Sequence, residues 1–394
     1  MNFIALKMLT GDRAKYLSLI FTVAFASFLL ANQVSIFCGI MLRTASQVVD
    51  VADADLWVMD RETQYAEETK AFTDNALYRI RGITGVDWAV PLYKGYARAT
   101  AADGKFRQVI LLGLDDATLV GAPRQMLLGR FEDLQIPDAV IIDRAGYAYY
   151  FPGESLALGK TFELNDHRAR LVGIAEASAP FATFPVFYSR YSQALNYVGR
   201  ERNLLSYVLV KAEPRVSLDG LSDRIESETG LRAATTEDFK WQTIGFYLKN
   251  TGIPVNFGIT IALAFLVGAV VAGQTFYLFT LENLKQYGTL KAIGVTDGRI
   301  IGMILLQALT IGSLGYAIGM GIAALFFEIT LLHIPTRGIV LLWQAVIGTG
   351  ITVLIIIAAA SSASGGCWCS SLRSCFEDSE DERKRDCGSL PGAA

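Results

Sequence analysis

The chain alternates long apolar runs with polar stretches. Four runs contain no Asp, Glu, Lys or Arg, at residues 16–42, 250–281, 300–327 and 338–360. Each run is longer than the roughly 20 residues that a helix needs to cross the hydrocarbon core of a bilayer. The pattern predicts four transmembrane helices, with a short outer loop at 328–337 between the last two.

The longest polar stretch, residues 43–249, lies between the first and second apolar runs and contains no spanning segment. Asp103-Gly104 separates two strand-like segments and predicts a hairpin, because we expect a positive φ at both turn positions. Further expected elements are strands at 51–60, 86–92, 155–158, 168–174, 207–211 and 231–235 and helices at 73–81, 218–228 and 236–250. The predicted fold is an α-helical membrane protein with four transmembrane helices and a large α+β extracytoplasmic domain between helices 1 and 2.

Charge orients these elements in the membrane. Between residues 282 and 299, three basic side chains outnumber two acidic ones, which places this connector in the cytoplasm. Residues 1–15 mix three basic with several apolar side chains, a pattern typical of an amphipathic segment on the inner membrane face. Both termini are therefore expected in the cytoplasm, and residues 43–249 on the far side.

The cytoplasmic connector has the spacing of a short helix. Leu284, Tyr287, Leu290 and Lys291 recur every three to four residues, and Gly294 stands where a helix commonly stops. On composition alone, an ordinary solvated loop explains the segment equally well.

The order of residues in the connector favours a more specific interpretation. The pattern Glu282-x-x-Lys285-Gln-Tyr-Gly288-x-Leu-Lys-Ala-x-Gly294 resembles the cytoplasmic coupling segment of MacB/FtsX-class ABC transporter permeases, most closely the DevC-type exporters of glycolipids. The resemblance extends to about Ala360. It implies contact with a separate cytoplasmic ATPase through Glu282, Lys285, Tyr287, Gly288, Leu290, Lys291, Ala292 and Gly294.

The same resemblance implies partners and a mechanism. In this class a homodimer in the inner membrane works with an HlyD-type periplasmic adaptor and an outer-membrane channel. ATP binds to the partner subunit, and mechanotransmission to the outer domains exports the substrate, here expected to be lipid-like. An FtsX-like subunit that controls a periplasmic hydrolase, or that acts as a sensor, is the alternative.

Composition and motifs argue against other classes of function. A chain that is 52% hydrophobic and 19% charged is too apolar for a soluble enzyme of this size, and a net charge of −3 gives no basic field for nucleic acid. His167 and His333 are the only histidines, and neither has Cys or carboxylate neighbours at metal-ligand spacing. Gly153 to Thr161 has five residues between its glycines, whereas a phosphate-binding loop needs four. We therefore expect no catalytic residue, metal or cofactor in this chain.

Two further patterns allow two interpretations each. Gly315-x-x-x-Gly319 permits close helix packing, with packing inside the chain slightly preferred over a dimer seam. The aromatic, proline-punctuated stretch from Ala179 to Tyr188 is either a surface for the adaptor or a buried loop over the domain core. Its candidate contact residues are Phe181, Phe184, Phe187 and Tyr188.

The tail at 361–394 departs from the family. Cys367, Cys369 and Cys375 look like a metal cluster at first sight, but the Cys367-x-Cys369 pair is tighter than the usual zinc pair, and Cys387 completes no second pair. If GC-rich codons are assumed, reading the segment from Gly366 offset by two bases restores a family-like Leu-Glu-Pro ending. We expect the tail to be a frameshift product without structure or function.

Overall fold

The structure, a computed structural model, describes residues 2–11, 13–51, 53–199, 204–333 and 338–358. The chain divides into two compact units, a helical one from Met1–Phe37, Val255–His333 and Ile339–Ala394, and a mixed one from Cys38–Pro254 and Ile334–Gly338. The predicted frameshifted tail and its cysteines lie outside the described residues.

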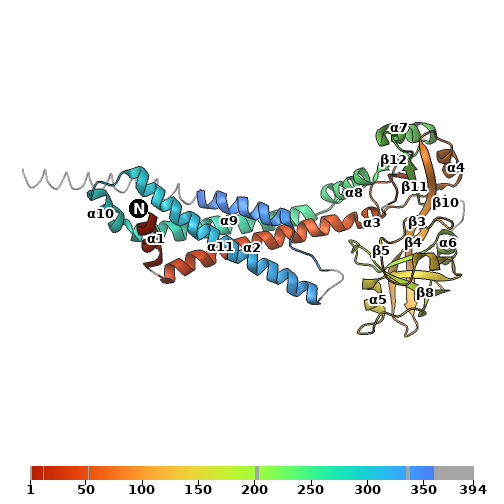
Figure 1. Ribbon diagram of the computed structural model, residues 1–394, viewed down its shortest axis with the longest axis horizontal. Helices are drawn as coiled ribbons and strands as arrows, with labels where there is room; N and C mark the ends of the chain where they lie inside the picture. The colour runs from red at the N-terminus through yellow and green to blue at the C-terminus, as the bar shows by residue number, and fades with distance from the viewer. Residues whose placement is uncertain (1, 12, 52, 200–203, 334–337, 359–394) are drawn as a thin grey trace, which may run out of the picture. The chain divides into compact units, whose positions relative to one another are not determined.

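The helical unit contains the predicted membrane helices (Figure 1). Its elements are α1 (Asn2–Gly11), α2 (Arg13–Thr44, which continues into the mixed unit), α9 (Ile253–Glu282), α10 (Leu284–Ala292), α11 (Asp297–His333) and the apolar helix Trp343–Ala358. Among the described residues, α2, α9 and α11 are long and apolar enough to cross a membrane, and Trp343–Ala358 is shorter. The number of four spans therefore stays a prediction.

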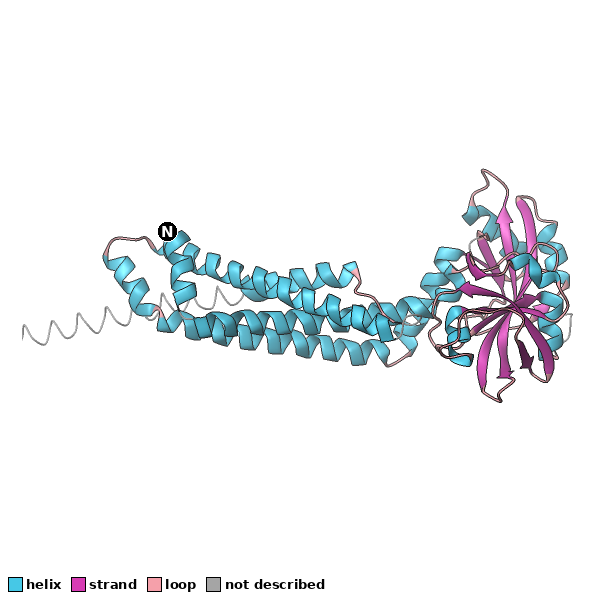
Figure 2. Cartoon of the chain, turned by 60° about the horizontal axis from the view of Figure 1, so that its bottom comes forward, coloured by secondary structure: helices cyan, strands magenta, loops and turns pink. Residues whose placement is uncertain are grey.

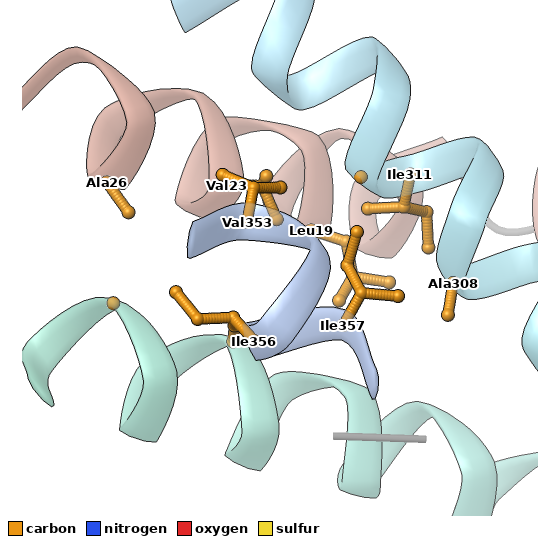
Figure 3. A pocket seen from close by; sticks show the side chains of 11 residues that line it. Leu19, Val23, Ala26, Ala308, Ile311, Val353, Ile356 and Ile357 are labelled. Atoms are coloured by element: carbon orange, nitrogen blue, oxygen red, sulfur yellow. The ribbon is translucent and has the colours of Figure 1, made fainter. Parts of the chain in front are cut away.

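Helix α11 continues to His333 and so includes the first residues of the outer loop predicted at 328–337. Apolar side chains hold the bundle together. Figure 3 shows Val23 of α2, Ile311 of α11 and Ile357 of the last helix around an apolar pocket of about 30 Å³, which Ala272 of α9 also lines. The pocket is large enough for a water molecule, but its apolar lining offers no polar partners to hold one in place.

The mixed unit is built on one sheet of ten strands (Figure 2). Their order is β12-β1-β11-β3-β4-β9-β6-β8-β5, and β7 pairs with both β3 and β8. The strands of this sheet are β1 (Leu56–Met59), β3 (Val86–Ala101), β4 (Phe106–Leu114), β5 (Gln125–Leu128), β6 (Ala139–Asp143), β7 (Thr161–Leu164), β8 (His167–Glu176), β9 (Val186–Arg190), β11 (Tyr207–Ala212) and β12 (Arg232–Thr235). A small second sheet pairs β2 (Phe72–Thr73) with β10 (Leu204–Leu205).

Strand β3 belongs to both halves of this unit. Its first half pairs with β11, and its second half pairs with β4. Because β7 bridges β3 and β8, the strands β3, β4, β9, β6, β8 and β7 close into a ring. The two lobes expected from the sequence are thus the strands β12-β1-β11-β3 and this ring.

Helices cover the sheet on both faces. In the first lobe, α4 (Asn75–Arg81) and α7 (Leu218–Thr229) pack on Leu56 and Val58 of β1, whereas Phe239 of α8 (Thr236–Asn250) packs with Trp57 on the opposite face. The remaining helices of this unit are α3 (Ser46–Val49), η1 (Phe131–Gln135), α5 (Arg144–Tyr150) and α6 (Tyr191–Val198). The strand predicted at 51–60 forms only over β1, Leu56–Met59, and it is buried on both faces, whereas the alternation of apolar and acidic residues had indicated one exposed face.

Two hairpin expectations need correction. The Asp103-Gly104 hairpin is present, but only Gly104 has a positive φ, of 84°. The Gly104 N–H donates to the Ala101 carbonyl, which makes a tight turn followed by a left-handed glycine. The strand predicted at 155–158 does not form, and β7 at Thr161–Leu164 takes its place in the pairing with β8.

Candidate functional site

The connector between the second and third predicted spans is a short helix with a defined end. Helix α10 follows α9 after Asn283, and α11 begins at Asp297. Gly294 has a φ of 97° and donates to the Lys291 carbonyl, while Val295 N–H donates to the Leu290 carbonyl. This pair of bonds is a Schellman motif, which explains the glycine at this position. An ion pair of 2.9 Å between Lys291 and Asp297 links α10 to the start of α11.

The inner side of α10 carries one fully buried aromatic residue. The Tyr287 hydroxyl donates to Gln307 Oε1 of α11 at 3.0 Å, and Gln307 Nε2 donates to the Ala5 carbonyl of α1 at 2.8 Å. Tyr287 and Gln307 are both 0% exposed, and burial raises the pKa of Tyr287 to about 12. The aromatic ring packs in a cluster with Leu9 of α1 and Ile304 of α11. One face of α10 is therefore fixed to two other helices.

The outer side of α10 is open. Lys285, Gln286 and Thr289 are exposed, and the Lys285 ammonium has no ion pair or hydrogen bond with the residues that the structure describes. Just after the helix, the Ile293 side chain is 76% exposed. An exposed cation near the start of the connector helix and an exposed large apolar side chain at its end could both contact another protein.

The predicted connector residues therefore divide between two roles. Lys285 and Ala292 point outward, whereas Tyr287 points inward. A Cβ added at Gly288 meets nothing within 4 Å. Leu290 is half-buried. Glu282 pairs with Lys15 of α2.

Sequence reasoning missed Gln307, Ala5 and Ile293. Gln307 did leave a signal, because it is the only amide side chain in the run 300–327. Polar groups in such runs usually bond to another helix. Nothing in the sequence pointed to the Ala5 carbonyl as its acceptor, since the two residues lie far apart along the chain.

The two glycines predicted to pack helices contact α2 of the same chain. A Cβ added at Gly315 would lie 2.7 Å from Val23 Cβ, and one added at Gly319 would lie 2.4 Å from the Ala24 carbonyl oxygen. Real Cβ atoms do not approach other atoms this closely. Both positions thus require glycine where α11 crosses α2.

The predicted adaptor surface is corrected at two of its four positions. Phe187 and Tyr188 belong to β9 and are 0% and 2% exposed, because β9 lies between β4 and β6 in the sheet. They cannot contact a partner. Phe181 and Phe184 are half-buried, with their rings 5.1 Å from Tyr247 and 5.8 Å from Tyr96. No group of three or more potential metal ligands occurs among the described residues.

Comparison with known families places the chain in a class. Residues 20–228, more than half of the chain, match the MacB-like periplasmic core domain, and residues 258–373 match the FtsX-like permease C-terminal region. The chain belongs to the MacB/FtsX-type family of ABC transporter permeases. These matches define the class and leave the narrower DevC-type resemblance as a prediction.

Individual relatives cover only part of the chain. An uncharacterized ABC transporter permease of Mycobacterium tuberculosis is 30% identical over 169 residues, which are 42% of this chain and 44% of that protein. A Staphylococcus epidermidis protein named as the hemin transport system permease HrtB is 26% identical over 113 residues, 29% of this chain and 31% of that protein. The chain therefore spans less than half the length of these curated relatives.

Two solved structures match part of this chain. The periplasmic region of MacB from Actinobacillus actinomycetemcomitans covers 52% of this chain and 96% of its own, with 15% identity and a TM-score of 0.38. The extracellular domain of YknZ from Gram-positive bacteria covers 46% of this chain and 98% of its own, with 16% identity and a TM-score of 0.36.

Proposed function

We propose that this permease is the membrane subunit of an ABC-type exporter and that α10 receives force from a separate cytoplasmic ATPase. The observation that supports this role is the two-sided environment of α10. Its inner face is fixed by Tyr287, while Lys285 and Ile293 are exposed and available to a partner. In this proposal ATP binds to the partner, and the permease itself needs no cofactor and performs no chemistry.

The inner face would carry force into the bundle. The ring of Tyr287 packs with Ile300 and Ile304 of α11, so displacement of α10 is resisted by a dry core rather than absorbed by a loop. Closing of two ATPase subunits on a homodimer would then move the membrane helices. Because α2 and the segment after Asn250 connect these helices to the outer domain, the movement would reach that domain and expel its substrate.

The proposed orientation follows from charge. In this orientation the connector and both termini lie in the cytoplasm, and the large domain lies on the periplasmic side of the inner membrane. An HlyD-type adaptor and an outer-membrane channel would receive a lipid-like substrate, as in DevC-type systems. Because Phe187 and Tyr188 are buried, the proposed adaptor contact is limited to Phe181 and Phe184, whose rings are half-buried.

A second candidate function shares the same mechanics. In this alternative the permease is an FtsX-like subunit whose movement controls a periplasmic hydrolase or reports an outer ligand, and the FtsX-like match at residues 258–373 fits both functions. An exporter works with an adaptor and a channel, whereas the alternative needs only an ATPase and an outer effector. The proteins that copurify with the tagged permease therefore separate the two.

The test is an activity measurement on the permease purified with its bound ATPase from its own membranes. The double variant Lys285→Glu, Ile293→Asp should reduce ATP hydrolysis per permease about tenfold or more, because charge reversal and an added carboxylate oppose the contact. The matched control is Lys105→Glu, an exposed lysine of the outer domain. If the double variant keeps the parent's ATPase content and rate, α10 is not the coupling element.

A further inference from the structure

Gln307 lies at the junction of three helices that are distant in sequence. It is 0% exposed in α11, accepts a hydrogen bond from Tyr287 of α10 and donates one to the Ala5 carbonyl of α1. Figure 1 shows α1 and α10 at the same end of the helical unit. One side chain therefore links the connector helix to the N-terminal helix.

The orientation of the Gln307 amide follows from its partners. A carbonyl oxygen such as that of Ala5 can only accept a hydrogen bond, so the Gln307 nitrogen must face it. The Gln307 oxygen then faces the Tyr287 hydroxyl, which donates. Glutamine supplies a donor and an acceptor at once and has the reach for both, which an aliphatic side chain of similar length lacks.

Helix α1 is held at this junction by packing as well. Ala5 and Leu9 are 0% exposed, and Leu9 shares its apolar cluster with Tyr287 and Ile304. The sequence predicts α1 as a segment on the membrane surface, and the structure attaches it to the connector.

We propose that Gln307 is a positioning residue that joins α1, α10 and α11 into one moving body, so that α1 takes part in coupling. The inference rests on the proposed function, in which α10 receives force from an ATPase. An amide with two bonds resists sliding of α10 past α11 and of α1 past α11 at the same time. Buried polar bonds are suited to this because each leaves an unpaired group when broken.

The structural part of the proposal is tested without any ATPase. Hydrogen–deuterium exchange is measured on the full chain in detergent for the parent and for Gln307→Met, which keeps an unbranched side chain but removes the amide. We expect backbone amides of both α1 and α10 to exchange about tenfold faster in this variant. Tyr287→Phe removes only the bond to α10 and should accelerate α10 more than α1.

The control removes an equivalent bond elsewhere on α11. The Tyr316 hydroxyl donates to the Val346 carbonyl of the last helix at 2.8 Å, so Tyr316→Phe deletes a phenolic bond that does not involve α1 or α10. It should leave exchange in both helices unchanged. Unchanged exchange in Gln307→Met, or faster exchange in only one of the two helices, overturns the proposal.

The functional part is tested on the permease purified with its bound ATPase. Gln307→Met should lower the rate of ATP hydrolysis per bound ATPase about fivefold or more while the amount of bound ATPase stays constant, since the exposed face of α10 is intact. A parent-like rate despite loosened helices overturns the role of α1 in coupling but leaves the ATPase contact in place. By contrast, an ATPase content and rate like the parent's in the Lys285→Glu, Ile293→Asp variant refutes the proposed function itself.

Discussion

Replacing Gly319 by alanine tests how tightly α11 packs on α2. An added Cβ would lie 2.4 Å from the Ala24 carbonyl oxygen and 2.8 Å from Ser27 Cβ. The first of these atoms belongs to the backbone and cannot rotate away, so the two helices must separate. Such overpacking costs about 1–3 kcal/mol.

Gly321 of the same helix provides the control. An added Cβ there meets nothing within 4 Å, and alanine improves helix propensity by up to about 1 kcal/mol. The propensity gain applies to both variants and cancels when they are compared. The Gly319→Ala protein should therefore be less stable than the Gly321→Ala protein by about 1–3 kcal/mol.

Reversible unfolding in mixed micelles of increasing SDS content, followed by circular dichroism, measures this difference. The account is refuted if Gly319→Ala unfolds at the same SDS fraction as Gly321→Ala and the parent. If the Gly319→Ala substitution instead shifts only a monomer–dimer equilibrium and leaves the stability unchanged, the glycines form a seam between two copies. That is the second interpretation of the Gly315-x-x-x-Gly319 pattern.

Three more predictions concern pH, backbone conformation and topology. Burial lowers the pKa of Lys94 to about 8, so between pH 8 and about 10.5 this lysine binds its proton more fully in the unfolded chain than in the folded one. From pH 8 to 9.5 the free energy of unfolding of the parent should therefore rise by about 1.5 kcal/mol relative to that of Lys94→Met in denaturant titrations, and an equal pH dependence of the two proteins refutes the assignment. Gly294→Ala should lower the stability of the connector helix by about 1 kcal/mol, because Gly294 has a φ of 97° that alanine rarely adopts. Gly288→Ala, where an added Cβ meets nothing within 4 Å, should not lower it, and hydrogen exchange of α10 measures both effects. A cysteine at Asp103 should react with an impermeant thiol reagent from outside the inner membrane and one at Gln286 should not; the reverse pattern refutes the proposed orientation.

Features that depend on residues close together in the sequence were predictable. The connector helix and its stop at Gly294 follow from residue spacing and from a glycine that allows positive φ. The hairpin at Gly104 follows from the same chemistry. Uncharged runs of sufficient length likewise predicted α2, α9 and α11.

Features set by distant contacts were not predictable. The sequence left Phe187 and Tyr188 open between an exposed surface and a buried loop, because the strand order that places β9 between β4 and β6 leaves no trace in local sequence. Asp53 and Asp55 alternate with apolar residues just before Trp57 and suggest a half-exposed strand, but Phe239 of α8 covers Trp57 from far along the chain. Gln307 was visible as a polar residue in an apolar run, and only the fold reveals its two partners.

Photo-crosslinking from the connector tests the central claim most directly. A photoreactive phenylalanine analogue at Ile293, which is 76% exposed, is compared in intact cells with the same group at Tyr78 of the outer domain, which is 65% exposed. The account predicts that position 293 crosslinks to a protein with an ABC-type nucleotide-binding domain, identified by mass spectrometry, and that position 78 does not. Crosslinking of that ATPase from position 78, or its absence at position 293 while it copurifies with the permease, would contradict coupling through α10.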